Sequence, residues 1–90
     1  MLFAMKLRDW RIQNNMSQRG CSEALGLAGG ARSFQRIETG ETGVDADMAM
    51  RIISLTNGAV SLQDMHETRL DWIRRERPEK LACVTREVAQ

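Results

Sequence analysis

Residues 17–40 read SQRGCSEALGLAGGARSFQRIETG. Ser17 is a good helix N-cap, so the sequence predicts a short helix from Gln18 to Leu25 that Gly26 ends. Another helix, the third of the chain (helix three), is expected from Ala31 to Thr39, because Phe34 and Ile37 share one face and polar side chains occupy the other. Gly40 supplies its C-terminal stop. The stretch therefore predicts two short helices joined by a glycine-containing connector, with the second helix apolar on one face only.

Helical spacing continues on both sides of this stretch. Phe3, Leu7 and Trp10 fall on one face of a first helix, which Asn14-Asn15 ends. After residue 40, Asp45 is the expected N-cap of a fourth helix that closes at Asn57-Gly58. Its apolar stripe consists of Met48, Ile52 and Leu55, widened by Ala49 and Ile53.

A fifth helix is expected from Leu62 towards Pro78, because Ser61 and Asp64 have the spacing of a capping box. No strand alternation of useful length and no internal repeat interrupts this pattern. We therefore expect an all-α fold of five helices, with a domain over residues 1–77 and a short C-terminal tail over residues 78–90.

The composition favours one small cytoplasmic domain without enzymatic activity. The chain has 90 residues, of which 42% are hydrophobic and 28% charged, and no apolar run approaches a membrane span. The N-terminal MLFAM is too short for a signal peptide. Cys21 and Cys83 fit no metal spacing, and His66 is the sole histidine. We expect no cofactor, no metal and no catalytic pair.

The charge is divided unevenly along the chain. Residues 1–40 carry six basic and three acidic groups, whereas residues 41–90 carry seven basic and nine acidic groups. The N-terminal part could therefore face a polyanion. Outside a motif, the neighbouring Arg32 and Arg36 would be interpreted as an ordinary solvated face.

The segments 17–27 and 34–40 together resemble the helix-turn-helix of the Cro and phage-repressor (lambda-repressor-like, or Xre) family, in the type found in small prophage or mobile-element regulators. They contain the glutamine that opens the first helix of the motif, the turn glycine, the apolar pair three apart and the Glu-x-Gly ending. Two features depart from the family pattern. Ser22 stands where alanine is usual, and Gly26 and Glu38 are twelve residues apart, two more than usual. The pair Gly29-Gly30 looks like the insertion, which leaves the register of DNA contacts open.

The resemblance implies that residues 31–39 form a recognition helix in the major groove of DNA. Gln18 and Arg19 would lie against phosphates, and helix three would present four side chains to base edges and phosphates, namely Arg32, Ser33, Gln35 and Arg36. The resemblance also implies an ion pair between Arg11 and Glu38. Without it, these would be two exposed charges of little consequence.

One helix-turn-helix reads few base pairs, so the resemblance implies a homodimer on an inverted-repeat operator. The expected dimer surface is the fifth helix, residues 61–77, with Leu62, Met65, Leu70, Trp72 and Ile73 as its contacts. Ninety residues leave no room for a domain that senses a small molecule, so no small-molecule effector is expected. The implied function is a sequence-specific transcriptional regulator, most simply a repressor that blocks polymerase.

A second hypothesis is a protein–protein interaction module, such as an antiactivator or an antitoxin-like adaptor. The near-neutral net charge and the lengthened turn favour it, whereas the polar outward face of helix three opposes it. Exposure of Arg32, Gln35 and Arg36 in line with Gln18 would favour DNA binding. Coverage of helix three by the tail would favour the interaction module.

Overall fold

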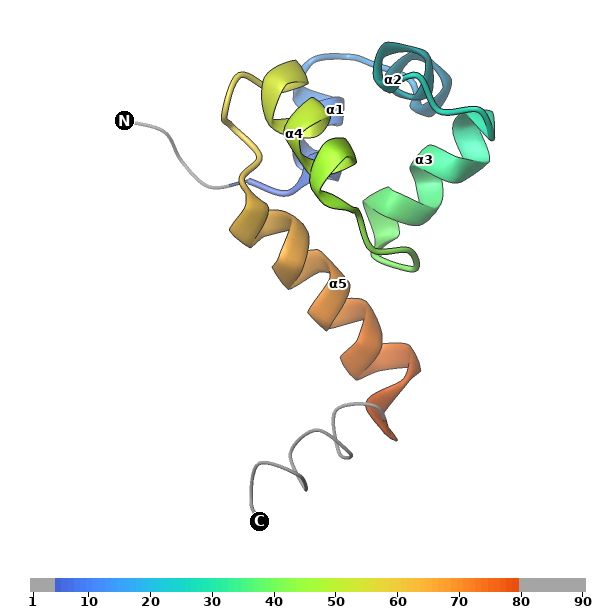
Figure 1. Cartoon of the computed structure of the whole chain (residues 1–90), viewed down its shortest axis with the longest axis vertical. Coiled ribbons are helices and arrows are strands. Elements are labelled where there is room, and N and C mark those ends of the chain that lie inside the picture. The colour runs from blue at the N-terminus through green and yellow to red at the C-terminus, as the bar shows by residue number, and fades with distance from the viewer. Residues whose placement is uncertain (1–4, 80–90) are drawn as a thin grey trace.

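The computed structural model describes residues 5–79, and within that range the chain forms helices and no strand (Figure 1). The helices are α1 (Leu7–Gln13), α2 (Gln18–Leu25), α3 (Gly30–Thr39), α4 (Ala46–Leu55) and α5 (Leu62–Glu76). The predicted all-α class with five helices is therefore confirmed. No helix in the described range is both long and apolar enough to cross a membrane.

Three helices begin where a side chain accepts a hydrogen bond from a free backbone N–H. Ser17 accepts from the N–H of Gly20 at the start of α2, and Asp45 accepts from the N–H of Met48 at the start of α4. Ser61 and Asp64 form the predicted capping box of α5, in which each side chain accepts from the other residue's backbone N–H. Each such cap stabilises its helix by about 1 kcal/mol. These starts agree with the sequence prediction.

The helix ends also follow the sequence, with small differences in bounds. Gly26 and Gly40 end α2 and α3 in the left-handed region, with φ of 70° and 92°. Asn15 and Asn57 adopt similar positive φ angles just after α1 and α4. α3 starts at Gly30 instead of Ala31, and α5 ends at Glu76, before Pro78. Phe3, Cys83 and the tail beyond residue 79 lie outside the described residues.

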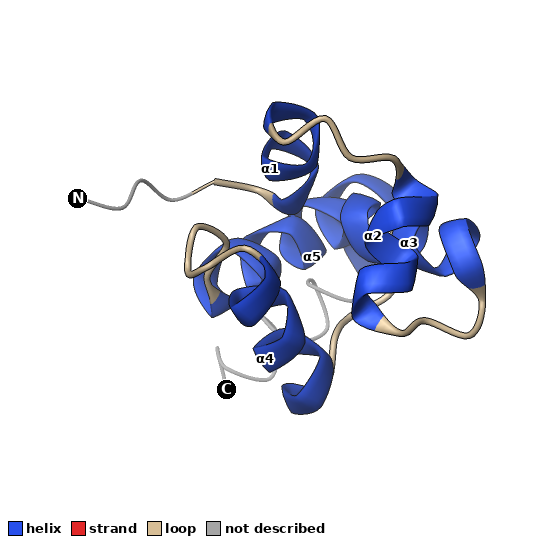
Figure 2. Ribbon diagram, turned by 90° about the horizontal axis from the view of Figure 1, so that it is seen from above, coloured by secondary structure: helices blue, strands red, loops and turns tan. Residues whose placement is uncertain are grey.

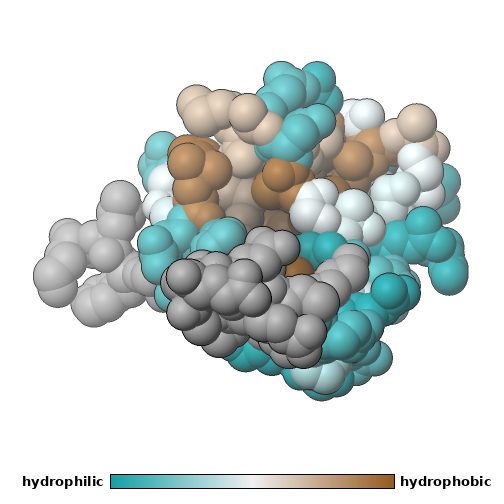
Figure 3. Space-filling view, turned by 60° about the horizontal axis from the view of Figure 1, so that its bottom comes forward, coloured by the Kyte–Doolittle hydropathy of each residue, from teal (hydrophilic) through white to brown (hydrophobic). Residues whose placement is uncertain are grey.

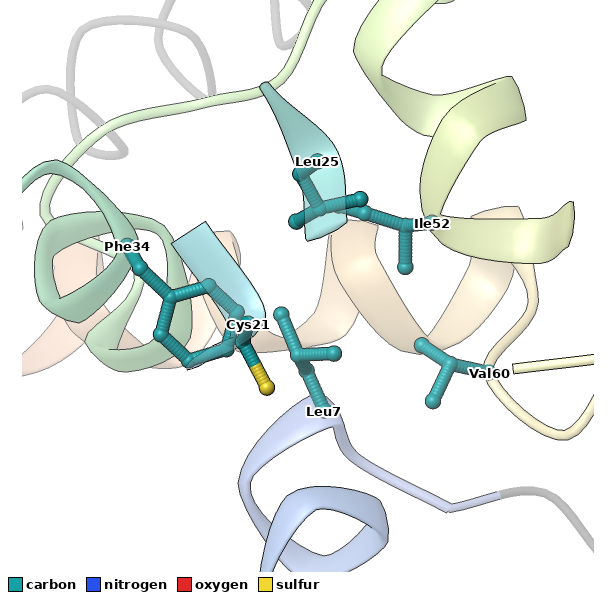
Figure 4. Packing of buried hydrophobic residues seen from close by; sticks show 6 residues of the cluster. All are labelled: Leu7, Cys21, Leu25, Phe34, Ile52 and Val60. Atoms are coloured by element: carbon teal, nitrogen blue, oxygen red, sulfur yellow. The ribbon is translucent and has the colours of Figure 1, made fainter. Parts of the chain in front are cut away.

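The core takes one or two apolar side chains from each of the first four helices and one from the loop before α5. Figure 4 shows these side chains pointing towards one another, with the Phe34 ring beside Cys21 and Leu25 beside Ile52. Each is at most 4% exposed: Leu7, Cys21, Leu25, Phe34, Ile52 and Val60. Burying one aliphatic or aromatic side chain of this size stabilises the fold by roughly 1.5–3 kcal/mol. Half-buried Trp10 packs against this cluster.

The arrangement places α3 between two other helices. In Figure 1, α3 lies between α2 and the C-terminal half of α5, while α1 and α4 complete the cluster. Figure 2 shows the same group from above, with α2 close to α3. Contacts of α5 with both α3 and α4 hold this longer helix to the cluster. Helix α3 therefore packs against α1 and α2 on one side and against α5 on the other.

Candidate nucleic-acid interface

Helix α3 has one buried and one exposed face. Phe34 is fully buried and Ile37 is half-buried against the core. On the other side, four polar side chains are exposed: Arg32, Gln35, Arg36 and Thr39. Four polar side chains therefore form a continuous outer face on a helix that is anchored from behind.

Close packing of α2 against α3 depends on small side chains. Ser22 is only 1% exposed, and its hydroxyl donates to the carbonyl oxygen of Arg19 at 2.7 Å, so the buried oxygen is satisfied. Cys21 is fully buried beside Phe34, and burial raises the pKa of its thiol, which stays protonated. The small hydroxyl of Ser22 and the buried thiol of Cys21 therefore let α2 lie close to α3.

Glu38 is the centre of a buried polar cluster that joins α1, α2 and α3. Arg11 approaches its carboxylate with two nitrogens, Nε at 2.5 Å from Oε2 and Nη2 at 3.3 Å from Oε1. The side chain of Glu38 is 3% exposed and that of Arg11 17%. The hydrogen bond to Glu38 raises the pKa of Arg11, although burial acts in the opposite direction. The ion pair that the resemblance implied is present, and it is not a pair of exposed charges.

Gln18 belongs to this cluster. Its Nε2 donates to Oε1 of Glu38 at 3.1 Å, and the residue is half-buried. The side chain expected at the phosphate backbone therefore has a partner within the protein, and it orients α2 on α3. Arg19, its neighbour, is 83% exposed and lies 3.4 Å from Glu23 on the same helix.

The two glycines of the lengthened turn set the start of α3. Gly30 has a φ of 69°, which bends the chain into the helix with open space around the position of a Cβ. A Cβ at Gly29, in contrast, would collide with the hydroxyl of Ser33. Ser33 therefore turns back over the start of its own helix and is not in line with Arg32 and Arg36. Of the four side chains predicted on helix three, the structure brings three together.

A groove of about 320 Å³ runs between the outer face of α3 and the C-terminal half of α5. Its α3 side and the following loop contribute Arg32, Gln35, Arg36, Thr39 and Glu41, and its α5 side contributes Trp72, Arg75 and Glu76. Arg36 and Glu41 form an ion pair with Nε and Oε2 3.4 Å apart, and both side chains are about half exposed. No carboxylate among residues 5–79 pairs with Arg32.

Helix α5 is fixed to the end of α3 by backbone contact and by Arg69. A Cβ at Gly40 would lie 2.4 Å from the carbonyl oxygen of Thr68 and 3.0 Å from Cβ of Trp72. Arg69 donates to the carbonyl oxygens of Gly40 and Glu41 at 2.8 and 2.6 Å, and its guanidinium lies 5.4 Å from the centre of the Trp72 ring. The pattern of apolar spacing gave no sign of this contact between distant segments.

The five apolar residues predicted at a dimer surface do not share one exposed face. Met65 packs against the core and Trp72 against the end of α3, while Leu70 and Ile73 are half-buried. Leu62 is 58% exposed and borders an apolar groove of about 500 Å³ between α4 and α5, which also includes Val44, Ala46, Ala49 and Met65. In Figure 3, apolar atoms gather in the upper half of the view, with hydrophilic atoms along the lower and right edges.

Within residues 5–79, no three metal-ligating side chains lie close together. His66 is exposed and borders the apolar groove between α4 and α5.

No family model matches the sequence, and no curated protein or solved structure is significantly similar to it.

Proposed function

We propose that this protein is a sequence-specific DNA-binding regulator of the Cro and phage-repressor type, which acts in the cytoplasm by occupying an operator in duplex DNA. The observation that carries this proposal is the outer face of α3, where Arg32, Gln35 and Arg36 are exposed side by side. The inner face of the same helix is anchored by Phe34 and Glu38. A rigidly held helix with donors on its free face can enter a major groove without unfolding its supports.

The side chains of this face suit base edges. Arginine binds O6 and N7 of guanine with two hydrogen bonds, and glutamine binds N6 and N7 of adenine in the same way. One such pair discriminates against the wrong base by about 1–3 kcal/mol. The Arg36–Glu41 pair costs little to open, because exposed ion pairs contribute at most about 1 kcal/mol. Arg36 can therefore exchange Glu41 for a DNA acceptor.

Arg19 remains the better phosphate ligand of the two residues at the start of α2. It is highly exposed, whereas Gln18 is engaged with Glu38. We propose that Gln18 contributes mainly by fixing the position of α2, and that Arg19 contacts the backbone.

The experiment is a selection of the purified protein against a random pool of duplex DNA. The Arg32→Ala, Arg36→Ala double variant is run in parallel with an Arg74→Ala control, whose guanidinium pairs with Asp71 and does not line the groove. We expect the wild type and the control to enrich the same inverted repeat and the double variant to enrich none. All three should melt at similar temperatures.

Failure of the wild type to enrich or retain DNA even at low salt, where phosphate attraction is strongest, would contradict the proposal. The interaction module would then be the better hypothesis.

We also propose that the protein acts as a homodimer, with the apolar groove beside Leu62 as the contact. Leu62→Arg should lower the mass measured by light scattering across a dilution series. Ile12→Arg is the matched control, since Ile12 is 51% exposed on α1. An equal mass for wild type and Leu62→Arg at every concentration would place the contact elsewhere.

A further inference from the structure

The C-terminal end of α5 lies beside the outer face of α3. Arg75 lines the groove together with Arg32, Arg36 and Thr39. It also borders a second groove, next to Thr39, which Lys6 and Arg8 line together with Asp9, Glu38 and Asp71. This second groove has as many acidic as basic side chains, so the position of Arg75 beside α3 is the one that matters for an anionic ligand.

The position of Arg75 is determined by the packing of α5. Arg75 follows Trp72 by three residues, so the two side chains lie on the same face of the helix. Trp72 is held against Gly40, and Arg69 binds the carbonyl oxygens at the end of α3. These contacts bring the last turns of α5 alongside α3 with little freedom to separate.

Three arginines occur at this end of α5, and the helix dipole accounts for them only in part. Arg74, Arg75 and Arg77 all lie where positive charge stabilises a helix C-terminus. Arg74 and Arg75 are each 61% exposed and each has one carboxylate nearby, because Arg74 lies 3.1 Å from Asp71 and Arg75 lies 3.5 Å from Glu76. Of these two neighbours, only Arg75 lines the groove. The helix dipole would stabilise Arg74 and Arg75 equally, whereas only Arg75 is positioned to contact a ligand in the groove beside α3.

We propose that Arg75 binds a phosphate of the DNA strand that borders α3, so that the end of α5 is a second backbone contact of this protein. This inference rests on the proposed function. An α-helix with its side chains is about 10–12 Å in diameter and the major groove is about 12 Å wide. A helix that lies in the major groove fills its width. A cationic side chain beside the exposed face of α3, such as that of Arg75, would therefore be next to one of the phosphate strands.

Two acidic side chains weaken the attraction of this site for a phosphate, and one of them provides a second test of the contact. Glu76 and Glu41 line the same groove, and Glu76 lies 3.5 Å from Arg75. The arginines there outnumber the glutamates by one, with Arg32, Arg36 and Arg75 against Glu41 and Glu76. Neutralising Glu76 should therefore strengthen binding, and removing Arg75 should weaken it. Neither change should alter which sequence is preferred, because phosphate contacts carry no base information.

The test measures the affinity of the full chain for two duplexes across a series of salt concentrations. One duplex is the sequence enriched by the wild type and the other is a random-sequence duplex of equal length. Arg75→Ala should weaken binding to both by about fivefold or more at low salt, and should reduce the slope of log affinity against log salt by about 0.9. Glu76→Gln should strengthen binding to both.

Arg74→Ala is the matched control, because it removes an equally exposed arginine from the same turn of α5 outside the groove, and it should leave the salt slope unchanged. If Arg75→Ala and Arg74→Ala behave alike while the wild type still selects a sequence, this inference is overturned and the proposed function stands. If the wild type binds neither duplex at low salt, both are overturned.

Discussion

Glu38 and Glu41 are three residues apart and each pairs with an arginine, yet their surroundings differ completely. Glu38 is buried on the inner side of α3 and accepts hydrogen bonds from Arg11 and Gln18. Glu41 lies in the loop after α3, about half exposed, and its contact with Arg36 is 3.4 Å long. The inner pair and Gln18 together join three helices, whereas the outer pair leaves its arginine accessible. The same type of ion pair thus supports the fold on one side of α3 and can be exchanged for a ligand on the other.

The largest expected effect comes from breaking the inner pair. Glu38→Ala would leave Arg11 and Gln18 without their common acceptor in a largely buried site. Removing one partner of such a pair destabilises by roughly 3–5 kcal/mol, because the remaining charge stays uncompensated. Urea unfolding of the two purified proteins measures this difference.

Glu41→Ala is the control for this prediction. It removes an equal charge from an exposed pair, so the free energy of unfolding should change by at most about 1 kcal/mol. Equal losses in the two variants would contradict the distinction between the inner and outer sides of α3. Glu41→Ala should also leave Arg36 free of its partner, so DNA affinity should not fall.

A smaller effect is expected at Gly40, where the outer side of α3 meets α5. A side chain there combines a φ of 92° with a Cβ only 2.4 Å from the carbonyl oxygen of Thr68. Gly30→Ala is the matched comparison, because Gly30 has a φ of 69° and open space around its Cβ position. Strain alone costs about 1 kcal/mol or somewhat more, and the collision at Gly40 adds to it. Thermal unfolding should therefore give Gly40→Ala the clearly lower melting temperature, and the reverse order would mean that α5 does not pack here.

The sequence could predict those features that depend on nearby residues. Ser17, Asp45 and Ser61 cap helices through N–H groups three residues away, so local chemistry determined the starts of α2, α4 and α5. The bond from Gln18 to Glu38 joins residues on different helices, and spacing along the chain carries no trace of it. For this reason the resemblance places Gln18 against the DNA backbone and gives no sign of its contact with Glu38.

The same limit applies to α5. Its apolar residues were expected at a dimer surface, because a face of a helix can be identified from sequence but its partner cannot. The structure turns Met65 to the core and Trp72 to Gly40, which brings Arg75 beside α3. Gly40 was predicted as a helix stop, and its second role as the contact for α5 needs the tertiary arrangement.

The smallest expected effect concerns a third ion pair, which is about as exposed as the Arg36–Glu41 pair. Lys6 Nζ lies 2.8 Å from Asp71 Oδ2, and Arg74 Nη1 lies 3.1 Å from Oδ1. The hydrogen bond and charge of Lys6, followed by those of Arg74, lower the pKa of Asp71. The folded-state pKa lies below the unfolded value of about 3.9, so this contact stabilises the fold above that pH. The contribution is lost as the pH falls through the folded-state pKa.

Titration of the Asp71 carboxyl carbon by NMR measures this pKa directly. The midpoint should lie below that of an ordinary aspartate in the wild type and should rise in Lys6→Met. Arg74→Met should raise it less, because Lys6 makes the shorter contact and the larger contribution. An equal rise in both variants would mean that Asp71 responds only to the general positive charge at the end of α5. The contact between α1 and α5 would then be weaker than its geometry indicates, and α5 would be held to the domain chiefly through Gly40, Trp72 and Arg69.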